Sequence, residues 1–205
     1  MSKKKVSDLN GIKNLLFPVL PVLVGANVNG KPNYITIGGI GWLCYNAMSI
    51  SVGRKQYTNA GITENGTFSI NQPTTSMVKK LDYCGLHSGS KVDKSALFEN
   101  FYSELQTAPM IKECPINIEC RVVQIMERPV HTIFIGEVVT IYLEEDYLME
   151  GMPDVFKIDP VLVAPDKSRG GKYGGWGYWK LSEYLAPAWE VGKDLKSDKE
   201  NEAKP

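Results

Sequence analysis

The sequence lacks the residue patterns on which several classes of protein depend. Its 205 residues include only two histidines and four cysteines, at positions 44, 84, 114 and 120. No Cys-x-x-Cys pair occurs, which excludes a zinc ribbon and a thioredoxin-type redox pair. Neither GxGxxG nor GxSxG is present, so neither a Rossmann dinucleotide fingerprint nor a nucleophile elbow is indicated.

The chain also lacks an excess of charge and a long apolar run. Lys+Arg and Asp+Glu both number 23, so a broad nucleic-acid-binding surface is not expected. The longest apolar run, Leu15–Ala26, contains two prolines and is shorter than the roughly 20 residues that span a bilayer. Polar residues follow Lys3–Lys5 where a secretory signal would be apolar. We therefore expect a cytoplasmic protein with reduced thiols that binds neither membrane nor nucleic acid.

Strand signals dominate what the sequence does contain. Val19–Val28 ends at the turn pair Asn29-Gly30 and Asn33–Ile37 follows, which predicts a hairpin over 19–37. The alternation slips at Val122-Val123, which indicates a bulge. Further strands are expected at Ala47–Gly53, Thr67–Asn71, Ile116–Val122 and His131–Leu143. Strands at this density, joined by hairpins, predict a closed antiparallel barrel in a mainly β or α+β fold.

Helical patterns are fewer. Three segments are predicted as helices: Gln56–Asn65, which ends at a glycine, Thr74–Tyr83, and Ala96–Leu105. We expect residues 1–192 to form one domain. Eight of the thirteen residues in 193–205 are charged, so this stretch is predicted to be a mobile tail.

A strand that runs into three closely spaced glycines is the first candidate site. It is the segment NYITIGGIGWLC, Asn33–Cys44. Without Cβ atoms, its backbone can approach a flat ligand, although a glycine-kinked corner of the barrel explains the pattern equally well. The turn Arg54–Thr58 is the second candidate, because two cations, a hydroxyl and the first amides of a helix suit a phosphate. A solvated basic turn is the alternative.

Three weaker patterns remain. Cys84 and His87 form a single Cys-x-x-His pair, and without a second pair no metal site is expected. His131 and Glu137 share a strand face if no bulge intervenes, although a lone strand histidine is more often structural. The stretch RGGKYGGWGYWK at 169–180 resembles single-strand nucleic-acid binders, but the balanced charge favours a loop that folds over a ligand or a partner subunit.

Six segments, taken in order along the chain, point to a known family. They are PVLPVLV from Pro18, NYITI from Asn33, FSINQP from Phe68, DYCGLHSG from Asp82 with Asp93-Lys94 beyond it, ECPINIEC from Glu113, and HTIFIGEVV from His131. From about Phe17 to Leu143 the chain resembles the flavin reductase-like, FMN-binding split-barrel proteins, and among them the flavoredoxin-like branch.

This resemblance implies a six-stranded antiparallel Greek-key split barrel with inserted helices, forming a homodimer that binds FMN near the dimer interface. Thr36 and the backbone of 37–44 would line the ring or the ribityl chain. The residues concerned in that stretch are Ile37, Gly38, Gly39, Gly41, Trp42 and Cys44.

The resemblance assigns the remaining residues to other parts of the site. The phosphate would lie on Arg54, Lys55 and Thr58, and the pocket would be completed by Asn71, Cys84, Ser88 and Lys94. His131 matches a recurrent family histidine near the flavin or the nicotinamide and is the candidate catalytic residue.

The expected function is that of an FMN-binding oxidoreductase, which passes electrons from NAD(P)H or a protein donor to a redox partner protein or a small-molecule acceptor. Two alternatives stay open. One is a non-catalytic split barrel that binds another ligand such as haem, and the other is a nucleic-acid-binding barrel that uses 169–180.

Overall fold

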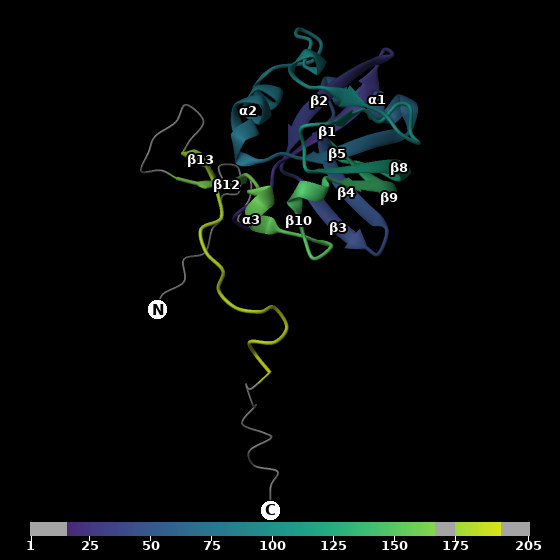
Figure 1. The fold of residues 1–205 in the computed structure, drawn as a ribbon. Coiled ribbons are helices and arrows are strands. Elements are labelled where there is room, and N and C mark those ends of the chain that lie inside the picture. Colours follow the sequence, from purple (N-terminus) through teal and green to yellow (C-terminus); the bar gives the residue numbers. More distant parts are fainter. Residues whose placement is uncertain (1–15, 167–174, 194–205) are drawn as a thin grey trace, which may run out of the picture.

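The structure is a computed structural model that describes residues 16–166 and 175–193. One curved sheet forms the body of the molecule, with α2 and the β12–β13 hairpin beside it and a C-terminal segment that runs away from it (Figure 1). Residues 194–205 of the predicted tail and residues 169–174 of the glycine- and tryptophan-rich stretch lie outside the described residues.

A seven-stranded antiparallel sheet has the strand order β2-β1-β5-β8-β9-β4-β3. In chain order these strands are β1 (Val22–Val28), β2 (Lys31–Ile37), β3 (Ile40–Cys44), β4 (Ala47–Gly53), β5 (Thr67–Gln72), β8 (Ile116–Glu127) and β9 (His131–Leu143). The mainly β class is confirmed.

Two local expectations for the sheet are confirmed. Asn29 and Gly30 have positive φ angles of 51° and 72°, the geometry that lets a two-residue turn join β1 to β2. The β8–β9 register shifts between Val122 and Gln124, so the bulge lies where the alternation of side chains slips.

The sheet has seven strands rather than the six that the resemblance implies. The reason is the glycine pair Gly38–Gly39, where the chain turns from β2 into β3. Before the pair the chain hydrogen-bonds to β1, and after it the chain pairs with β4. The two edge strands are thus halves of one bent segment, which draws the sheet toward closure. The glycine-kinked corner considered from the sequence is therefore present.

Apolar side chains from this sheet fill its inner face. The cluster includes Val24, Ile37, Ile50, Phe68 and Phe134, all buried. Glycine is required at 136 because a Cβ there would lie 2.6 Å from the ring of Phe68. The inner face is thus packed with side chains, and ligand space is found elsewhere.

Two predicted helices are confirmed. Helix α1 (Tyr57–Asn65) ends at Gly66, whose φ of 65° and amide bond to the Ile62 carbonyl form the predicted glycine cap. The second begins as the 3-10 turn η1 (Thr75–Met77) and continues as α2 (Val78–Leu86). Helix α2 packs on the outer face of β1 and β2 through a second apolar cluster.

The predicted helix Ala96–Leu105 is wrong. The structure has a 3-10 turn, η2 (Ser95–Leu97), and a short strand, β6 (Asn100–Phe101), paired with β7 (Met110–Ile111). Tyr34 decides the conformation. Its hydroxyl donates to Asn100 Oδ1 at 2.7 Å, and its ring meets that of Phe98 edge-on at 5.3 Å. These contacts outweigh the helical spacing of the apolar residues.

The remaining elements are short. They are η3 (Glu145–Tyr147), β10 (Leu148–Met149), β11 (Met152–Pro153), α3 (Val155–Ile158), β12 (Leu162–Pro165) and β13 (Trp176–Trp179). Backbone bonds of 2.9 and 2.8 Å join Val19 to Val163 and so attach the β12–β13 hairpin beside the first strand. Within the described residues, no helix is long and apolar enough to cross a membrane.

Candidate functional site

A pocket of about 590 Å³ opens beside the glycine kink and is named here the apolar pocket. Thr36, Gly38 and Gly39 form one wall. The rest of the lining comes from Val19, Pro21, Val163, Trp176 and Tyr178. The volume and the mixture of aromatic rings with a few polar groups are typical of small-molecule sites. Three of the residues predicted for the flavin ring therefore lie in one cavity.

The kink packs tightly against its neighbours. The Ser51 amide donates to the Gly39 carbonyl at 2.8 Å, and a Cβ on Gly39 would lie 3.0 Å from that of Ser51. A Cβ on Gly38 would lie 3.2 Å from the Val19 side chain. The sheet itself thus needs small residues here, and the same residues leave their backbone bare toward the pocket.

Thr36 is the polar side chain on the glycine wall. Its hydroxyl donates to the Leu81 carbonyl in α2, so its proton is in use while the oxygen can still accept a hydrogen bond. Gly85 lies opposite, where a Cβ would be 3.4 Å from the Cβ of Thr36. Thr36 therefore joins the pocket wall to the last turns of α2.

The opposite wall comes from β13. The Tyr178 hydroxyl donates to Asp82 Oδ1 in α2 at 2.7 Å, and burial, followed by this bond and the carboxylate charge, raises the pKa of Tyr178. Trp176 meets the ring of Phe17 edge-on, with 5.4 Å between centroids. The sequence pattern predicts a segment that folds over a ligand, but only the structure identifies Trp176 and Tyr178 as wall residues.

A second pocket, of about 310 Å³, lies at the other end of β2 and is named here the basic pocket. Its lining includes Lys31, Asn33, Tyr57, Lys91, Asp93 and Lys94. The Asp93 carboxylate accepts from the Ser95 amide at 2.9 Å and the Ser95 hydroxyl at 2.6 Å. Three cations against one engaged carboxylate give this pocket a positive balance.

Two of the segments that carry predicted site residues meet beside the basic pocket. Gly89, in the loop after α2, packs on Asn33 and Tyr57 so closely that any Cβ would clash with the Asn33 side chain. Ser88, next to it, is half-buried and shares a 2.9 Å hydroxyl contact with Ser90. The structure thus places the first residue of α1 next to the loop after α2.

Two of the predicted polar residues, Thr58 and Asn71, are engaged inside the protein. Thr58 is buried and its hydroxyl accepts from Asn33 Nδ2 at 2.6 Å. Asn71 is fully buried: its Nδ2 donates to the Leu23 carbonyl and its Oδ1 accepts from the Ile111 amide. Because their polar atoms are already hydrogen-bonded inside the protein, these side chains support the fold.

Lys94 caps a helix from inside the protein. It is 3% exposed, and its ammonium donates to the carbonyls of Cys84 at 3.1 Å and His87 at 3.0 Å, at the end of α2. Burial lowers the pKa of Lys94 and raises the pKa of Cys84 to about 11. The Cys84 thiol is therefore protonated at neutral pH.

Arg54 and His131 lie together at the rim. The Arg54 guanidinium meets the Glu127 carboxylate at 3.3 Å on the surface, and Lys55 beside it is exposed. His131 pairs with Gly53 across the β4–β9 ladder. Gly53 lies two residues beyond Ser51, whose amide donates to the Gly39 carbonyl. His131, Arg54 and the glycine kink therefore share one end of β4. The β4–β9 register is continuous to Glu137, which shares the strand face of His131 at the far end.

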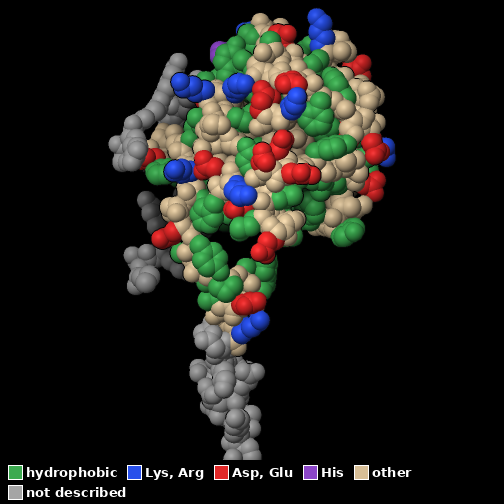
Figure 2. All heavy atoms as spheres, viewed as in Figure 1, with side chains coloured by type: hydrophobic (Ala, Val, Ile, Leu, Met, Phe, Trp, Pro, Cys, Tyr) green, Lys and Arg blue, Asp and Glu red, His purple; other side chains and the backbone are tan. Residues whose placement is uncertain are grey.

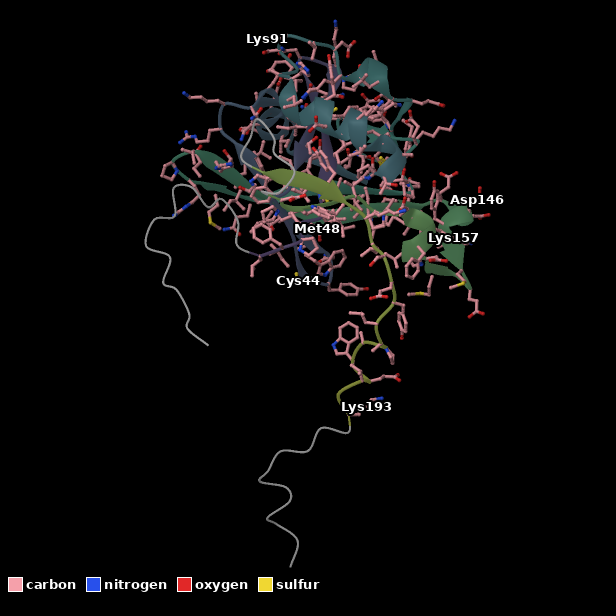
Figure 3. All side chains as sticks on the ribbon, turned by 90° about the vertical axis from the view of Figure 1, so that its left-hand side faces the viewer. Cys44, Met48, Lys91, Asp146, Lys157 and Lys193 are labelled. Atoms are coloured by element: carbon pink, nitrogen blue, oxygen red, sulfur yellow. The ribbon has the colours of Figure 1, made fainter. Side chains whose placement is uncertain are left out.

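The other predicted ring residues are divided by the kink. Ile37 is buried in the apolar cluster on the inner face of the sheet. Gly41, Trp42 and Cys44 belong to β3, where Trp42 is 57% exposed and Cys44 is on the surface. Figure 3 places Cys44 on the opposite side of the body from Lys91. Among the described residues, no group of three His, Cys, Asp or Glu side chains is arranged to hold a metal ion.

Comparison with known proteins gives a consistent result. A family described as "Flavin reductase like domain" matches residues 15–165. The flavoredoxin of Methanosarcina acetivorans is 43% identical with a TM-score of 0.86, over 96% of this chain and all of that one. The flavoredoxin of Desulfovibrio vulgaris (Miyazaki F) is 31% identical with a TM-score of 0.80, over 94% of this chain and all of that one.

A more distant structure shares the fold alone. The FMN-binding protein from Thermus thermophilus with bound 1-cyclohex-2-enone is 22% identical with a TM-score of 0.73, over 91% of this chain and 99% of that one.

Proposed function

Because the chain belongs to the flavin reductase-like family, in its flavoredoxin branch, we propose that it binds FMN and functions as a flavin-dependent oxidoreductase. The observation that carries the proposal is the apolar pocket, in which bare glycine backbone and Thr36 face the aromatic side chains of Trp176 and Tyr178. When bound, FMN supplies the electron-transfer chemistry between a donor and an acceptor.

The residues present suit both ends of FMN. The apolar pocket offers flat walls to a ring system, with the Thr36 oxygen as an acceptor. The basic pocket offers cations to a phosphate. Strand β2 joins the two pockets, and Asn33 to Gly38 spans roughly 17 Å at 3.3 Å per residue. A ligand with its ring and phosphate separated by a flexible chain can bridge such a span.

Within this proposal the phosphate lies between Arg54–Lys55 and the loop at Ser88–Lys91, whose polar atoms are accessible. Thr58 and Lys94 then support these segments through the bonds to Asn33 and to the end of α2. We propose that His131, which is exposed at the rim near the kink, contacts the electron donor, and that this donor is NADH or NADPH. A homodimer, with a protein or small-molecule acceptor, completes the proposal.

An absorption spectrum of the purified protein, followed by titration with FMN, tests cofactor binding. We expect one FMN per chain, and a colourless protein that takes up none would overturn the proposal. Anaerobic mixing with NADH and NADPH then tests the donor. If the protein binds FMN but neither NADH nor NADPH reduces it, the protein would be an electron carrier that depends on a protein donor. A haem spectrum would favour the non-catalytic alternative.

A further inference from the structure

The chain continues beyond β13 as a segment that leaves the body of the protein. Residues 180–193, named here the C-terminal arm, run away from the sheet in Figure 1, and Figure 2 shows hydrophobic side chains along much of them. Apart from half-buried Ala186, every residue of the arm is exposed. Among the described residues, the arm's hydrogen bonds and its ion pair are internal, such as the bond from the Val191 amide to the Pro187 carbonyl.

The exposed side chains of the arm are too apolar for a segment that belongs in water. Leu181, Tyr184, Leu185, Trp189 and Val191 are exposed by 37, 67, 86, 94 and 65%. Only Lys180, Glu183, Glu190 and Lys193 carry charge in the fourteen residues 180–193. Contiguous apolar surface of this kind marks a site of contact with another molecule.

The body carries a second uncovered apolar surface, on the β3–β4 hairpin. Trp42, Leu43 and Tyr45 are 57, 51 and 94% exposed. In Figure 1 β3 lies on the side of the body toward which the arm runs, and in Figure 3 Cys44 and Lys193 both lie away from Lys91. The arm and the hairpin are therefore on the same side of the molecule.

We propose that the arm of one chain lies over the β3–β4 hairpin of a second copy, and that the two copies exchange arms. Because both surfaces lie on one side of the chain, a two-fold axis can form both contacts at once. The arm of the first copy then covers the hairpin of the second, and the arm of the second covers the hairpin of the first. This inference rests on the homodimer proposed above and names the segment that holds it together.

The area available is sufficient for a stable dimer. An aromatic side chain buries roughly 150–250 Å². Tyr184 and Trp189 from two arms, together with an equal area on the surfaces they cover, reach roughly 1,200–2,000 Å², the range of standard protein interfaces. Leu181, Leu185 and Val191 add to it. A contact with so few charges should persist in high salt.

Photo-crosslinking tests where the arm lies. Trp189 is replaced by p-benzoylphenylalanine in chains labelled with 15N, mixed with unlabelled chains, exchanged and irradiated. We expect crosslinks between labelled and unlabelled chains that map to residues 42–45. The same crosslinker at Met152, which is 69% exposed on β11, is the control and should not reach that hairpin.

Light scattering on variants tests whether the arm holds the dimer. Leu185→Asp with Trp189→Asp should shift the mass from twice 22.8 kDa toward 22.8 kDa at micromolar concentration, as should Trp42→Asp, whereas Met152→Asp should not. Crosslinks confined to one chain, crosslinks to another surface, or a dimer unaffected by the arm variants would each overturn the arm exchange. FMN uptake measured on the same samples reports separately on the proposed function.

Discussion

The apolar pocket and the basic pocket are held together in different ways. The far wall of the apolar pocket is attached mainly by the backbone pair Val19–Val163 and the bond from Tyr178 to Asp82. The basic pocket rests on buried side-chain bonds, from Asn33 to Thr58 and from Lys94 to two carbonyls. Substitutions in the supports of the basic pocket should therefore destabilise the fold, whereas those in the walls of the apolar pocket should affect ligands first.

The largest effect is expected for Lys94→Met. It removes the two hydrogen bonds that the Lys94 ammonium donates to carbonyls at the end of α2, each worth roughly 1.5–3 kcal/mol. Part of this loss is offset because methionine has no ammonium to desolvate. We expect the free energy of unfolding to fall by about 3 kcal/mol in a urea titration. Lys91→Met, at an exposed lysine of the same loop, is the control. Equal losses in the two variants would contradict the internal cap.

Thr58→Val should have the next largest effect. It leaves the buried Asn33 amide without its acceptor, which costs about 2 kcal/mol of unfolding free energy. Thr63→Val, at an exposed position of the same helix, is the matched control for urea unfolding. Because Thr58 is buried, the ratio of FMN to riboflavin affinity should not change. A selective loss of FMN would return Thr58 to the phosphate site.

Arg54→Ala distinguishes a contact between Arg54 and the FMN phosphate from a contribution of Arg54 to the stability of the fold. Its surface pair with Glu127 contributes little to stability. A lost charge-assisted bond to phosphate should weaken FMN binding by about tenfold, while riboflavin, which has no phosphate, should be unaffected. Fluorescence quenching measures both affinities. Glu127→Gln keeps Arg54 and should not weaken FMN binding; equal losses for both flavins would place Arg54 outside the phosphate site.

His131→Ala should slow reduction by the nicotinamide more than it weakens FMN binding. The loss of one contact between His131 and the nicotinamide at the exposed rim corresponds to a rate of flavin reduction that is roughly threefold lower. Stopped-flow reduction under anaerobic conditions measures it, with FMN affinity determined in parallel. An unchanged reduction rate would assign His131 to the β8–β9 turn, where its carbonyl accepts from the Arg128 amide.

Tyr178→Phe should have the smallest effect. It keeps the ring in the pocket wall and removes only the bond to Asp82. On the scale of one half-exposed hydrogen bond, FMN should bind about twofold more weakly. Asp82→Asn, which retains an acceptor oxygen, should bind FMN almost as the parent does in the same titration. A loss of tenfold or more would mean that this bond holds the whole hairpin.

Local chemistry allowed part of the fold and of the candidate site to be predicted from the sequence. The Asn29-Gly30 turn, the bulge after Val122 and the glycine cap of α1 each depend on neighbours in the chain, and the structure has them. Thr36, Gly38 and Gly39 were also predicted as neighbours of one ligand, because they lie within four residues on one strand and its kink.

Tertiary contacts decided the rest, because they join residues far apart in the chain. Tyr34 holds 95–101 out of a helix, and the buried bonds of Thr58 and Asn71 turn apparent ligand groups into supports of the fold. The wall residues Trp176 and Tyr178 lie about 140 positions from Thr36. Periodicity reports only on residues a few positions apart, so the sequence by itself determined the strands, turns and kink, whereas the partners across the pocket followed only from the folded chain.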